Sequence, residues 1–521
     1  MHIHDNKLVV FRTRDPSRYA AIPRCAVVGE QNGVYEMAMR WGMEEALVAR
    51  NLGLKRMPSP ILAQYEWPGR FKPFDHQKDT ASFLTLHRRA FCLNEMGLGK
   101  TLSALWAADY LMKKKFVTRV LIVSPLSIMH SAWMNDLRSS IIHRTAAVAH
   151  HTDADRRREI IRGDYEFVII NYDGLAIVLD DIKKYGNFDL VIADEANALK
   201  SPQTARWKTF KAMLKPDTWL WLMTGSPAAQ SPEDAYGLAK LVCPDRVPVF
   251  FSGWRDKVMV KTSMYKWVPK REAKTMVFDV LQPAIRYTKK ECLDLPPVVT
   301  VMRDVPLTVQ QEKYYRLIKE KAFFAASGTT VTAVNAAATL NKLLQVSAGG
   351  SYTDDGDAIV FDCTPRLKVL SEIIEGTDRK VIVFVPFRHS IQTVVEYLLK
   401  EGVSADQIHG DVSVNERKRI IDAFQTTDAP HVLVVQPQTG SHGITLTAAD
   451  TVVYWGPVTS VDTYIQGMAR ADRIGQTSDK VTIIHLQGSH VERKLFTALQ
   501  QRQDLHTSTM DLYEDEMRNT L

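Results

Sequence analysis

The stretch AFCLNEMGLGKT, Ala90 to Thr101, decides the fold of this chain. It begins with apolar residues typical of a buried strand, and it ends in a glycine-rich turn followed by Lys100 and Thr101. The residues that follow have the pattern of a helix. Because glycine has no Cβ, Gly97 and Gly99 let backbone N–H groups approach an anion, and a helix N-terminus adds its dipole to the attraction. The stretch therefore predicts a strand, a phosphate-binding loop and a helix.

The groups of this loop have expected roles in holding a nucleoside triphosphate. Lys100 is placed to reach the β- and γ-phosphates, and Thr101 is placed to ligate Mg²⁺. The stock spacing GxxxxGK[ST] fails at its first position, which is Asn94, but the strand, the GKT and the helix are all in place. A chance glycine turn is the alternative. The loop residues expected to surround the nucleotide are Met96, Gly97, Leu98, Gly99, Lys100 and Thr101.

A second stretch, VIADEANALKSP, runs apolar residues directly into two adjacent carboxylates, Asp194 and Glu195. Taken alone, it indicates a strand end followed by a solvated helix cap. In ATPases with a phosphate loop, however, an Asp at a strand end holds Mg²⁺ together with the loop Thr, and a neighbouring residue positions the attacking water. The charge of the metal makes two adjacent carboxylates tolerable there. We therefore predict that Asp194 binds Mg²⁺ with Thr101 and that Glu195 is the catalytic base.

Two blocks of the chain repeat one rhythm of a short apolar strand, a loop and a helical pattern. Continuous apolar strands separated by helical segments indicate parallel sheets that are covered on both faces. The sequence therefore predicts two α/β domains. The expected strands are AFCLN, RVLIVS, EFVIIN, FDLVIA and TWLWLM within residues 90–223, and KVIVFVP, HVLVVQ, TVVYW and KVTIIHL within residues 380–486.

The remaining segments predict smaller modules around these two domains. Residues 1–69 read as three short strands, KLVVFRT, CAVVG and VYEMAMRW, and a helix closed by Gly53. Residues 310–344 are helical in pattern with a break at Gly328, and 349–362 read as a hairpin with an Asp-Gly turn. The expected domains are 1–69 as an accessory α+β module, 70–295 with a basic insertion at 228–295, 296–505 with a helical protrusion at 307–360, and a tail at 506–521.

Composition excludes several classes of protein. No run of 18 or more apolar residues occurs, which disfavours a membrane span, and the N-terminus lacks the pattern of a signal peptide. Five scattered cysteines with no CxxC pair indicate reduced thiols in a cytosol-like compartment. We expect a cytoplasmic protein that is not secreted, and the lack of a long regulatory extension suits a bacterial or viral source.

The positive charge is concentrated in one segment. The net charge is +7, and residues 253–291 hold ten Lys and Arg against four acids, interleaved with aromatic residues such as Trp254, Tyr265 and Trp267. Such mixing suits a polyanion surface, where cations meet phosphates and aromatic rings stack. A solvated basic face is the alternative, and composition does not separate the two.

Further motifs follow in order along most of the chain, and with them it resembles the SWI/SNF-type, remodeller-like branch of the superfamily-two helicases. The resemblance spans roughly residues 70 to 500. Its most specific part is QGMARADRIGQT, which has the spacing QxxxRxxRxGQ. The matching segments are FDHQ (74–77), LIVSPLSIMHSAW (121–133), NYDGL (171–175), DEAN (194–197), LMTGSP (222–227), TGSHGITLTAADTVVYWGP (439–457), QGMARADRIGQT (466–477) and VTIIHLQGSHVERKLF (481–496).

The resemblance implies two RecA-like lobes that clamp ATP and Mg²⁺ between them. Gln77 would read the adenine, and Gly443 would lie in the fifth motif at the nucleotide. Gln466, Arg470 and Arg473 belong to the sixth motif. The two arginines lie three apart on a helical pattern, so we expect them on one face, aimed across the cleft at the γ-phosphate, with Arg473 as the arginine finger.

Some positions depart from the family pattern. They lie in motifs that couple ATP hydrolysis to movement along the nucleic acid, so the efficiency of this coupling is what they would change. Asn197 replaces the usual His, Ala229-Gln230 stands where Gln-Asn is common, and Ser441 and Thr445 replace a usual Gly and Asn. The leading hypothesis is an ATPase that translocates on duplex or branched DNA and remodels DNA or DNA–protein structures, with compactness closest to fork-remodelling or annealing members. The alternatives are a strand-separating DNA or RNA helicase and an ATP-dependent nucleic-acid-binding module. The resemblance implies a nucleic-acid partner and no membrane.

Overall fold

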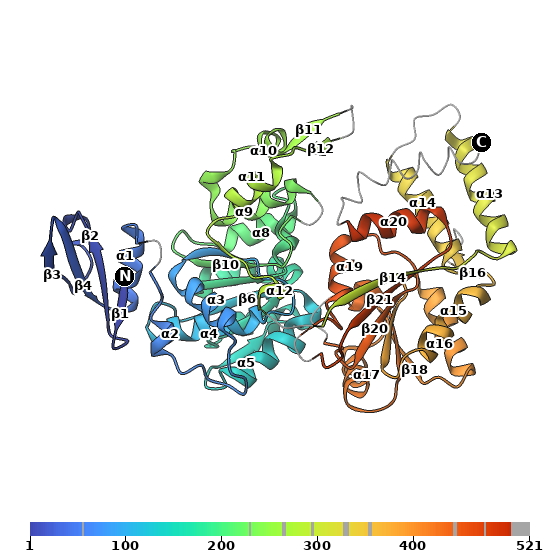
Figure 1. Ribbon diagram of the computed structural model, residues 1–521, viewed down its shortest axis with the longest axis horizontal. Coiled ribbons are helices and arrows are strands. Elements are labelled where there is room, and N and C mark those ends of the chain that lie inside the picture. The colour runs from blue at the N-terminus through green and yellow to red at the C-terminus, as the bar shows by residue number, and fades with distance from the viewer. Residues whose placement is uncertain are drawn as a thin grey trace. The chain divides into compact units, whose positions relative to one another are not determined.

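The chain divides into two compact units (Figure 1). The first contains 1–227, 234–254 and 275–292, and the second contains 228–233, 255–274 and 293–521. The domain boundaries predicted from the sequence stay a prediction. The computed structural model describes residues 1–501 except 55–56, 229–230, 263–266, 293–295, 327–332, 353–356, 441–444 and 474–475, and only the backbone of 323–326, 333–335 and 440.

The first unit is built on a seven-stranded sheet in which all neighbouring strands run parallel. Its central strands are buried along their whole length, because both faces of the sheet are covered. In sheet order the strands are β13 (Ala284–Ile285), β5 (Arg89–Cys92), β10 (Trp219–Met223), β9 (Leu190–Asp194), β6 (Val120–Ser124), β8 (Phe167–Asn171) and β7 (Ala146–Val148).

Most of the helices in this part of the chain lie in the connections between these strands, as parallel pairs require, and the others precede β5 or follow β13. They are α2 (Ile61–Gln64), α3 (Asp75–Leu86), α4 (Lys100–Lys113), α5 (Asn135–Ser140), α6 (Ala154–Arg162), α7 (Leu175–Asp181), α8 (Ala205–Met213), α9 (Ala235–Val242), α10 (Phe251–Val258), α11 (Ala273–Val280) and α12 (Lys289–Cys292). A two-stranded antiparallel ribbon, β11 (Met259–Lys261) and β12 (Trp267–Pro269), follows α10 and belongs to the second unit with the rest of residues 255–274.

The strand register brings two predicted motifs to one edge of the first sheet. Met223 at the end of β10 pairs with Cys92 of β5 on one side and with Asp194 of β9 on the other. The phosphate loop leaves β5 directly after Cys92, and Asp194 is the last residue of β9. The carboxyl ends of parallel strands share one edge, which is where ligands bind in open α/β sheets. The fold therefore places the loop and the carboxylates two strands apart on the same edge.

The N-terminal module of the first unit is an antiparallel sheet with a helix. The sheet order is β1 (His2–His4), β2 (Leu8–Thr13), β4 (Val34–Arg40) and β3 (Cys25–Gln31), followed by α1 (Met43–Asn51). The sequence predicted three strands, and this was wrong by one, because His2–His4 adds an edge strand. A turn at Asp5 and Asn6, with φ of 49° and 54°, joins it to β2. Two consecutive left-handed residues are the signature of a tight hairpin, so the Asp-Asn pair was the available signal.

The second unit is built on a six-stranded sheet in which all neighbouring strands run parallel. The prediction of two α/β domains is confirmed, and every predicted strand is present with its ends shifted by at most two residues. In sheet order the strands are β14 (Val298–Asp304), β21 (Val481–Gln487), β20 (Ala449–Tyr454), β17 (Lys380–Phe384), β19 (Val432–Val435) and β18 (Ala405–Ile408). The main helices are α15 (Thr364–Glu375), α16 (Arg388–Lys400), α17 (Val414–Thr426), α18 (Pro437–Gly440), α19 (Val461–Met468) and α20 (His490–Gln500).

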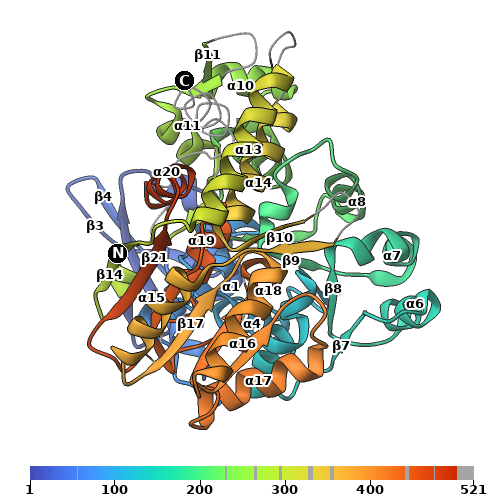
Figure 2. The same cartoon turned by 90° about the vertical axis from the view of Figure 1, so that its right-hand side faces the viewer.

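The predicted helical protrusion is a pair of helices, α13 (Val309–Ala326) and α14 (Ala333–Ser347), which lie side by side (Figure 2). A short hairpin follows them, with strands β15 (Gly350–Tyr352) and β16 (Ala358–Val360). The predicted helix break at Gly328 and the Asp-Gly turn at 355–356 lie outside the described residues. Among the described residues, no helix is both long and apolar enough to cross a membrane.

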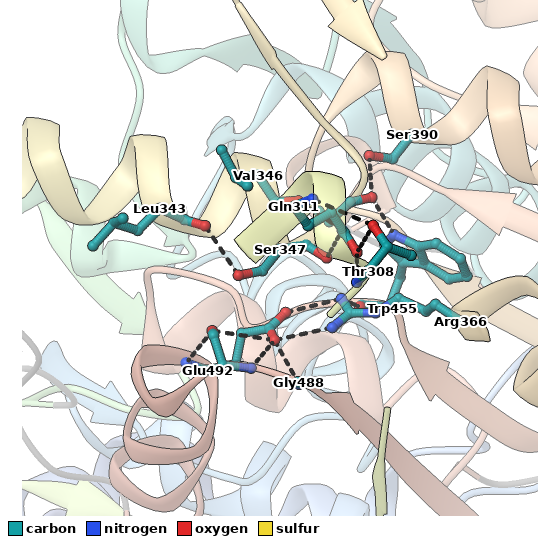
Figure 3. A network of polar contacts seen from close by, with 12 residues as sticks. Thr308, Gln311, Leu343, Val346, Ser347, Arg366, Ser390, Trp455, Gly488 and Glu492 are labelled. Carbon is teal, nitrogen blue, oxygen red and sulfur yellow. Dashed lines mark hydrogen bonds and ion pairs between the residues drawn. The ribbon is translucent and has the colours of Figure 1, made fainter. Parts of the chain in front are cut away.

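A buried polar network joins this helix pair to the second sheet (Figure 3). The Nη1 and Nη2 groups of Arg366 donate to the two carboxylate oxygens of Glu492 at 2.8 and 2.9 Å, and both side chains are buried. The indole of Trp455 donates to the carbonyl of Ala348 at 2.9 Å, just beyond α14. Gln311 of α13 donates to the carbonyl of Val346 at 2.8 Å. Because each buried group has a partner, the network fixes how the protrusion leaves the sheet.

Candidate nucleotide site

The phosphate loop has the backbone that its glycines predict. Gly97 and Gly99 have φ of 87° and 72°, in the left-handed region that side chains disfavour. A Cβ on Gly99 would lie 1.9 Å from Nε2 of Gln77, so any other residue there would displace the Gln77 side chain from the loop. The helix α4 begins at Lys100 directly after the loop. Its first N–H groups have no partner within the helix and can bind an anion.

The lysine of the loop is held by backbone oxygens. Nζ of Lys100 donates to the carbonyl of Asn94 at 2.9 Å and to the carbonyl of Glu95 at 3.3 Å. Oxygen atoms of a phosphate can replace both acceptors, because the lysine needs only to swing its flexible stem. Thr101 lies in the first turn of α4, and Met96 and Leu98 lie in the loop itself.

Asn94, which departs from the stock loop pattern, ties the loop to two other segments. Its side chain is buried; Nδ2 donates to Oγ1 of Thr80 at 2.8 Å, and Oδ1 accepts from the backbone N–H of Tyr287 at 3.0 Å. A glycine at this position could make neither contact. No local pattern signals this role, because Thr80 and Tyr287 lie 14 and 193 residues from Asn94 along the chain.

Gln77, the predicted adenine-reading residue, lies against the phosphate loop. Its Oε1 accepts from the backbone N–H of Phe74 at 3.0 Å, and its Nε2 lies 3.5 Å from the carbonyl of Leu98. The neighbouring His76 contacts the same carbonyl through Nε2 at 3.1 Å. Burial lowers the pKa of His76, which favours a neutral ring, and since a carbonyl only accepts, Nε2 carries the proton. His76 was not predicted as part of the site.

The two carboxylates at the end of β9 differ in environment. Asp194 is buried, with Oδ2 accepting from the indole N–H of Trp133 at 2.9 Å and Oδ1 accepting from the backbone N–H of Glu195 at 2.9 Å. Burial, assisted by repulsion from Glu195, raises the pKa of Asp194 to about 6, against the opposing effects of Lys100 and the Trp133 N–H. Glu195 is half-buried and has a left-handed backbone, with φ of 49°.

This donor set fits a magnesium nucleotide. A cation beside Asp194 would relieve both the desolvation of its carboxylate and its repulsion by Glu195. Thr101 and Asp194 would hold Mg²⁺, and the loop N–H groups with Lys100 would hold the phosphates. When bound, the metal supplies positive charge that neutralises the phosphate oxygens. Within the first unit, the fold thus brings together the predicted adenine residue, the loop and the carboxylate pair.

Asn197, which replaces the usual His, links the DEAN segment to the TGSP segment. Its Nδ2 donates to the carbonyl of Ser226 at 2.9 Å. Ser226 in turn donates its backbone N–H to Oγ1 of Thr224 at 3.2 Å. An asparagine amide therefore makes a direct connection between these two motifs. The departures at Ala229, Gln230 and Ser441, and the nucleotide-binding role predicted for Gly443, fall outside the described residues.

The sixth-motif residues lie in the second unit, and one prediction about them was wrong. Gln466 is buried in α19, but this helix ends at Met468, so Arg470 and Arg473 lie in the turn after it and not on one helical face. Tertiary hydrogen bonds override the helical pattern here. The carbonyl of Arg470 accepts from Leu446 N–H at 3.1 Å, and Nε2 of Gln476 donates to Ala449 and Ala471 carbonyls at 2.8 and 3.0 Å. These bonds draw the chain back to the sheet. Arg470 is buried and Arg473 is half-buried.

Two family models match this chain. The model of the SNF2-related domain matches residues 76–348, and that of the helicase conserved C-terminal domain matches residues 365–475. The chain is 23% identical over 469 residues to the ISWI chromatin-remodeling complex ATPase ISW1 of Saccharomyces cerevisiae, covering 83% of this chain and 40% of that protein. It is 25% identical over 435 residues to a SWI/SNF-related matrix-associated actin-dependent regulator of chromatin, subfamily A-like protein 1, of Xenopus laevis, covering 79% and 41%.

A solved structure is similar as well. The SWI2/SNF2 ATPase core of Sulfolobus solfataricus in complex with dsDNA is 23% identical, covering 87% of this chain and 98% of that chain with a TM-score of 0.41. The chain spans less than half of the length of the two curated relatives named above.

Proposed function

This chain belongs to the SNF2-related family, and from that premise we propose that it hydrolyses ATP with Mg²⁺ when it binds duplex or branched DNA. The reaction would drive the protein along DNA and remodel DNA or DNA–protein structures. The observation that carries this proposal is the shared sheet edge in the first unit, where Gly99, Lys100, Asp194 and Glu195 come together with Gln77.

The residues divide the work of hydrolysis among them. The loop N–H groups and Lys100 would bind and orient the phosphates, and Gln77 would select adenine. Glu195 would accept a proton from the attacking water, because its carboxylate is half-buried beside Asp194 and keeps access to solvent. We further propose that Arg473, with Arg470 and Gln466, neutralises the charge that develops on the γ-phosphate. Hydrolysis would then require residues of the second unit, and this requirement would couple ATP hydrolysis to movement along DNA.

Two alternatives remain distinct in class. A strand-separating DNA or RNA helicase would use the same site on a different substrate. An ATP-dependent binding module would need the nucleotide pocket but not the hydrolytic groups. The presence of Glu195, Arg470 and Arg473 in addition to Lys100 favours hydrolysis, since a module that only binds nucleotide would need Lys100 but could lose the other three.

We expect ATP hydrolysis to be slow without nucleic acid and to rise when duplex DNA is added. The reason is that backbone contacts with DNA would order the lobes for chemistry without reading bases. The measurement is the steady-state ATPase rate with no nucleic acid, with a plain duplex, with single-stranded DNA and with double-stranded RNA. Stimulation by single-stranded DNA or by RNA alone would favour the helicase alternative. Tight nucleotide binding with no turnover under any condition would favour the binding module.

The predicted polyanion surface at 253–291 needs correction in its aromatic part. Trp254 is 2% exposed and packs in the interior, so it cannot stack on a base. Trp267 lies beneath the guanidinium of Arg255 at 5.4 Å, and Arg255 pairs with Glu233 at 2.5 Å. The aromatic residues suggested stacking on bases, but the same residue types also pack in a protein interior, and composition does not separate these two uses. Tyr265 and Lys266 fall outside the described residues. The exposed cations of the part that belongs to the second unit are Lys257, Lys261, Arg271 and Lys274.

These exposed cations remain a proposed contact with the DNA backbone. Reversing Lys261, Arg271 and Lys274 to Glu should weaken DNA binding and flatten its salt dependence, because each lost phosphate contact lowers the log–log slope by about 0.9. ATP hydrolysis without DNA should barely change, since the segment lies outside the nucleotide motifs. The measurement is duplex affinity at several salt concentrations, and the control is the triple variant Lys368→Glu, Lys400→Glu and Lys418→Glu, which makes the same change of charge at exposed positions of α15, α16 and α17. A slope equal to that of the wild type would make the segment a solvated basic face.

The redox state of the cysteines bears on the compartment in which the protein works. All five are free thiols, at Cys25, Cys92, Cys243, Cys292 and Cys363. Free thiols persist where the surroundings are reducing. We propose that the protein works in such a compartment, the cytoplasm or its equivalent.

A further inference from the structure

The segments LIVSPLSIMHSAW (121–133) and NYDGL (171–175) resemble motifs that contact a nucleic-acid strand in this family, and each contains a buried polar residue. Ser124, at the end of β6, is fully buried, and Tyr172, directly after β8, is 6% exposed. Neither side chain can reach a backbone phosphate from these positions, so contacts with a strand must come from other residues of the two segments. The exposed residues in the two segments are their neighbours, among them Ser127, His130 and Asp173. A buried residue of each segment contacts Asp194.

The first segment reaches the catalytic carboxylate through Trp133. After β6 the chain passes through a short turn into a π-helical stretch, Met129–Met134, which leads into α5. Such stretches are rare and often mark functional sites. Trp133 is fully buried, and its indole N–H donates to Oδ2 of Asp194 at 2.9 Å. On the same stretch, His130 and Ser131 face the outside. This one stretch thus has an exposed side and a side that contacts Asp194.

The second segment reaches the same residue through Tyr172. The hydroxyl of Tyr172 donates to the backbone carbonyl of Asp194 at 2.7 Å. That carbonyl belongs to the peptide that joins Asp194 to Glu195, where Glu195 has a φ of 49°. A left-handed backbone in a residue other than glycine persists only where its surroundings hold it. Tyr172 therefore helps to fix the direction in which Glu195 leaves the strand. Beside it, the exposed Asp173 accepts from the guanidinium of Arg206 at 2.7 Å, and this exposed cation is the group that a phosphate can approach.

The partner of Trp133 sets it apart from other tryptophans of the first unit. The indoles of Trp41, Trp106, Trp207 and Trp221 donate to backbone carbonyls of Pro58, Pro68, Gly237 and His87. These are the partners that a purely structural buried indole finds. Trp133 donates to a carboxylate instead, and a hydrogen bond to a charged group is stronger than one to a carbonyl. Packing alone does not require that acceptor.

We propose that Trp133 and Tyr172 are positioning residues that connect the strand-contacting segments to Asp194 and Glu195. Trp133 sets the orientation of the Asp194 carboxylate, and Tyr172 sets the peptide that carries Glu195. A nucleic-acid strand that binds the exposed sides of the two segments thereby adjusts the geometry of both carboxylates. This inference rests on the proposed function in one respect, which is that DNA stimulates hydrolysis.

The test replaces Trp133 with Phe, which keeps a ring but removes the N–H donor. Trp207→Phe is the matched control, because Trp207 is also a buried donor of this unit, with its N–H 2.9 Å from the carbonyl of Gly237. Two quantities are measured: the affinity of a fluorescent ADP analogue with Mg²⁺ and with EDTA, and the ATPase rate with and without duplex DNA. We expect Trp133→Phe to weaken Mg²⁺-dependent affinity about ten-fold, the effect of losing one hydrogen bond to a charged group, and to leave affinity in EDTA unchanged. The ratio of rates with and without DNA should fall as well.

Tyr172→Phe removes only the hydroxyl oxygen, and it tests the contact with the Asp194 carbonyl separately from the contact made by Trp133. It should leave Mg²⁺-dependent affinity near the wild-type value and reduce both turnover and the stimulation by DNA, because it acts through Glu195. Trp207→Phe should change neither affinity nor the ratio. Equal behaviour of Trp133→Phe and Trp207→Phe in both measurements would overturn the proposal. If the wild type itself showed no DNA stimulation, the proposed function would fail, and an unchanged affinity of Trp133→Phe in Mg²⁺ would still separately overturn the link to Asp194.

Discussion

Replacing Glu195 with glutamine should lower kcat by about 10²–10⁴-fold, the usual cost of losing a general base. This corresponds to roughly 3–5 kcal/mol of barrier. The amide has the shape of the carboxylate but cannot accept the proton of the attacking water. ATP and Mg²⁺ should still bind, because the phosphate loop and Asp194 are untouched and the repulsion that raises the pKa of Asp194 is removed.

The measurement is single-turnover hydrolysis together with nucleotide affinity on the same preparation. Glu159→Gln is the matched control, since it makes the same chemical change at an exposed position of α6. Lys100→Ala should behave differently from Glu195→Gln and weaken both nucleotide affinity and turnover, because it removes a phosphate contact. Wild-type turnover in Glu195→Gln would remove Glu195 from the catalytic role assigned to it.

Replacing Arg473 with alanine should lower kcat by about 10³-fold or more, the range known for arginine fingers. Its guanidinium would stabilise the charge that builds on the γ-phosphate in the transition state, so the effect should fall on kcat and spare the affinity for ATP. Arg473→Lys should recover little, since an ammonium group lacks the planar fork of donors.

Arg419→Ala serves as the control in this experiment. Arg419 is an exposed arginine of the same unit, paired with Glu416 on α17 at 2.6 Å, so its loss tests charge without touching the sixth motif. If Arg470→Ala lowered kcat strongly and Arg473→Ala lowered it only slightly, Arg470 would be the arginine finger. Mild effects of both would place the charge-neutralising group elsewhere.

The parts of this fold that could be predicted from the sequence are those in which one local pattern has one physical meaning. Uninterrupted apolar strands such as VLIVS at β6 have nowhere to lie but between two covering layers. The glycines at 97 and 99 needed left-handed backbone, and they have it. Asp194 and the loop were predicted to meet, and the pairing of β5, β10 and β9 brings them to one edge.

The misses arose where distant contacts decide. Arg470 and Arg473 follow a helical spacing, yet hydrogen bonds from Leu446 and Gln476 pull them into a turn. Residues 253–291 have the composition of a nucleic-acid-binding surface, but Trp254 in that segment is buried in the interior. The edge strand β14 was not predicted, because it follows two prolines and exposes most of its side chains, so no alternation marks it. The bond from Trp133 to Asp194 spans 61 residues, and no local pattern reports it.

The central claim is that this chain moves along duplex DNA without processively separating its strands. The claim is tested most directly by displacement of a third strand from a triplex, paired with release of one strand from a long plain duplex in the same preparation. Unwinding must overcome stacking of about 1.4 kcal/mol for each base-pair step, whereas tracking a backbone need not. The account predicts ATP-dependent triplex displacement with little duplex separation, and no displacement by Glu195→Gln. Efficient separation of the plain duplex, or a triplex that stays intact while ATP is hydrolysed, would contradict it.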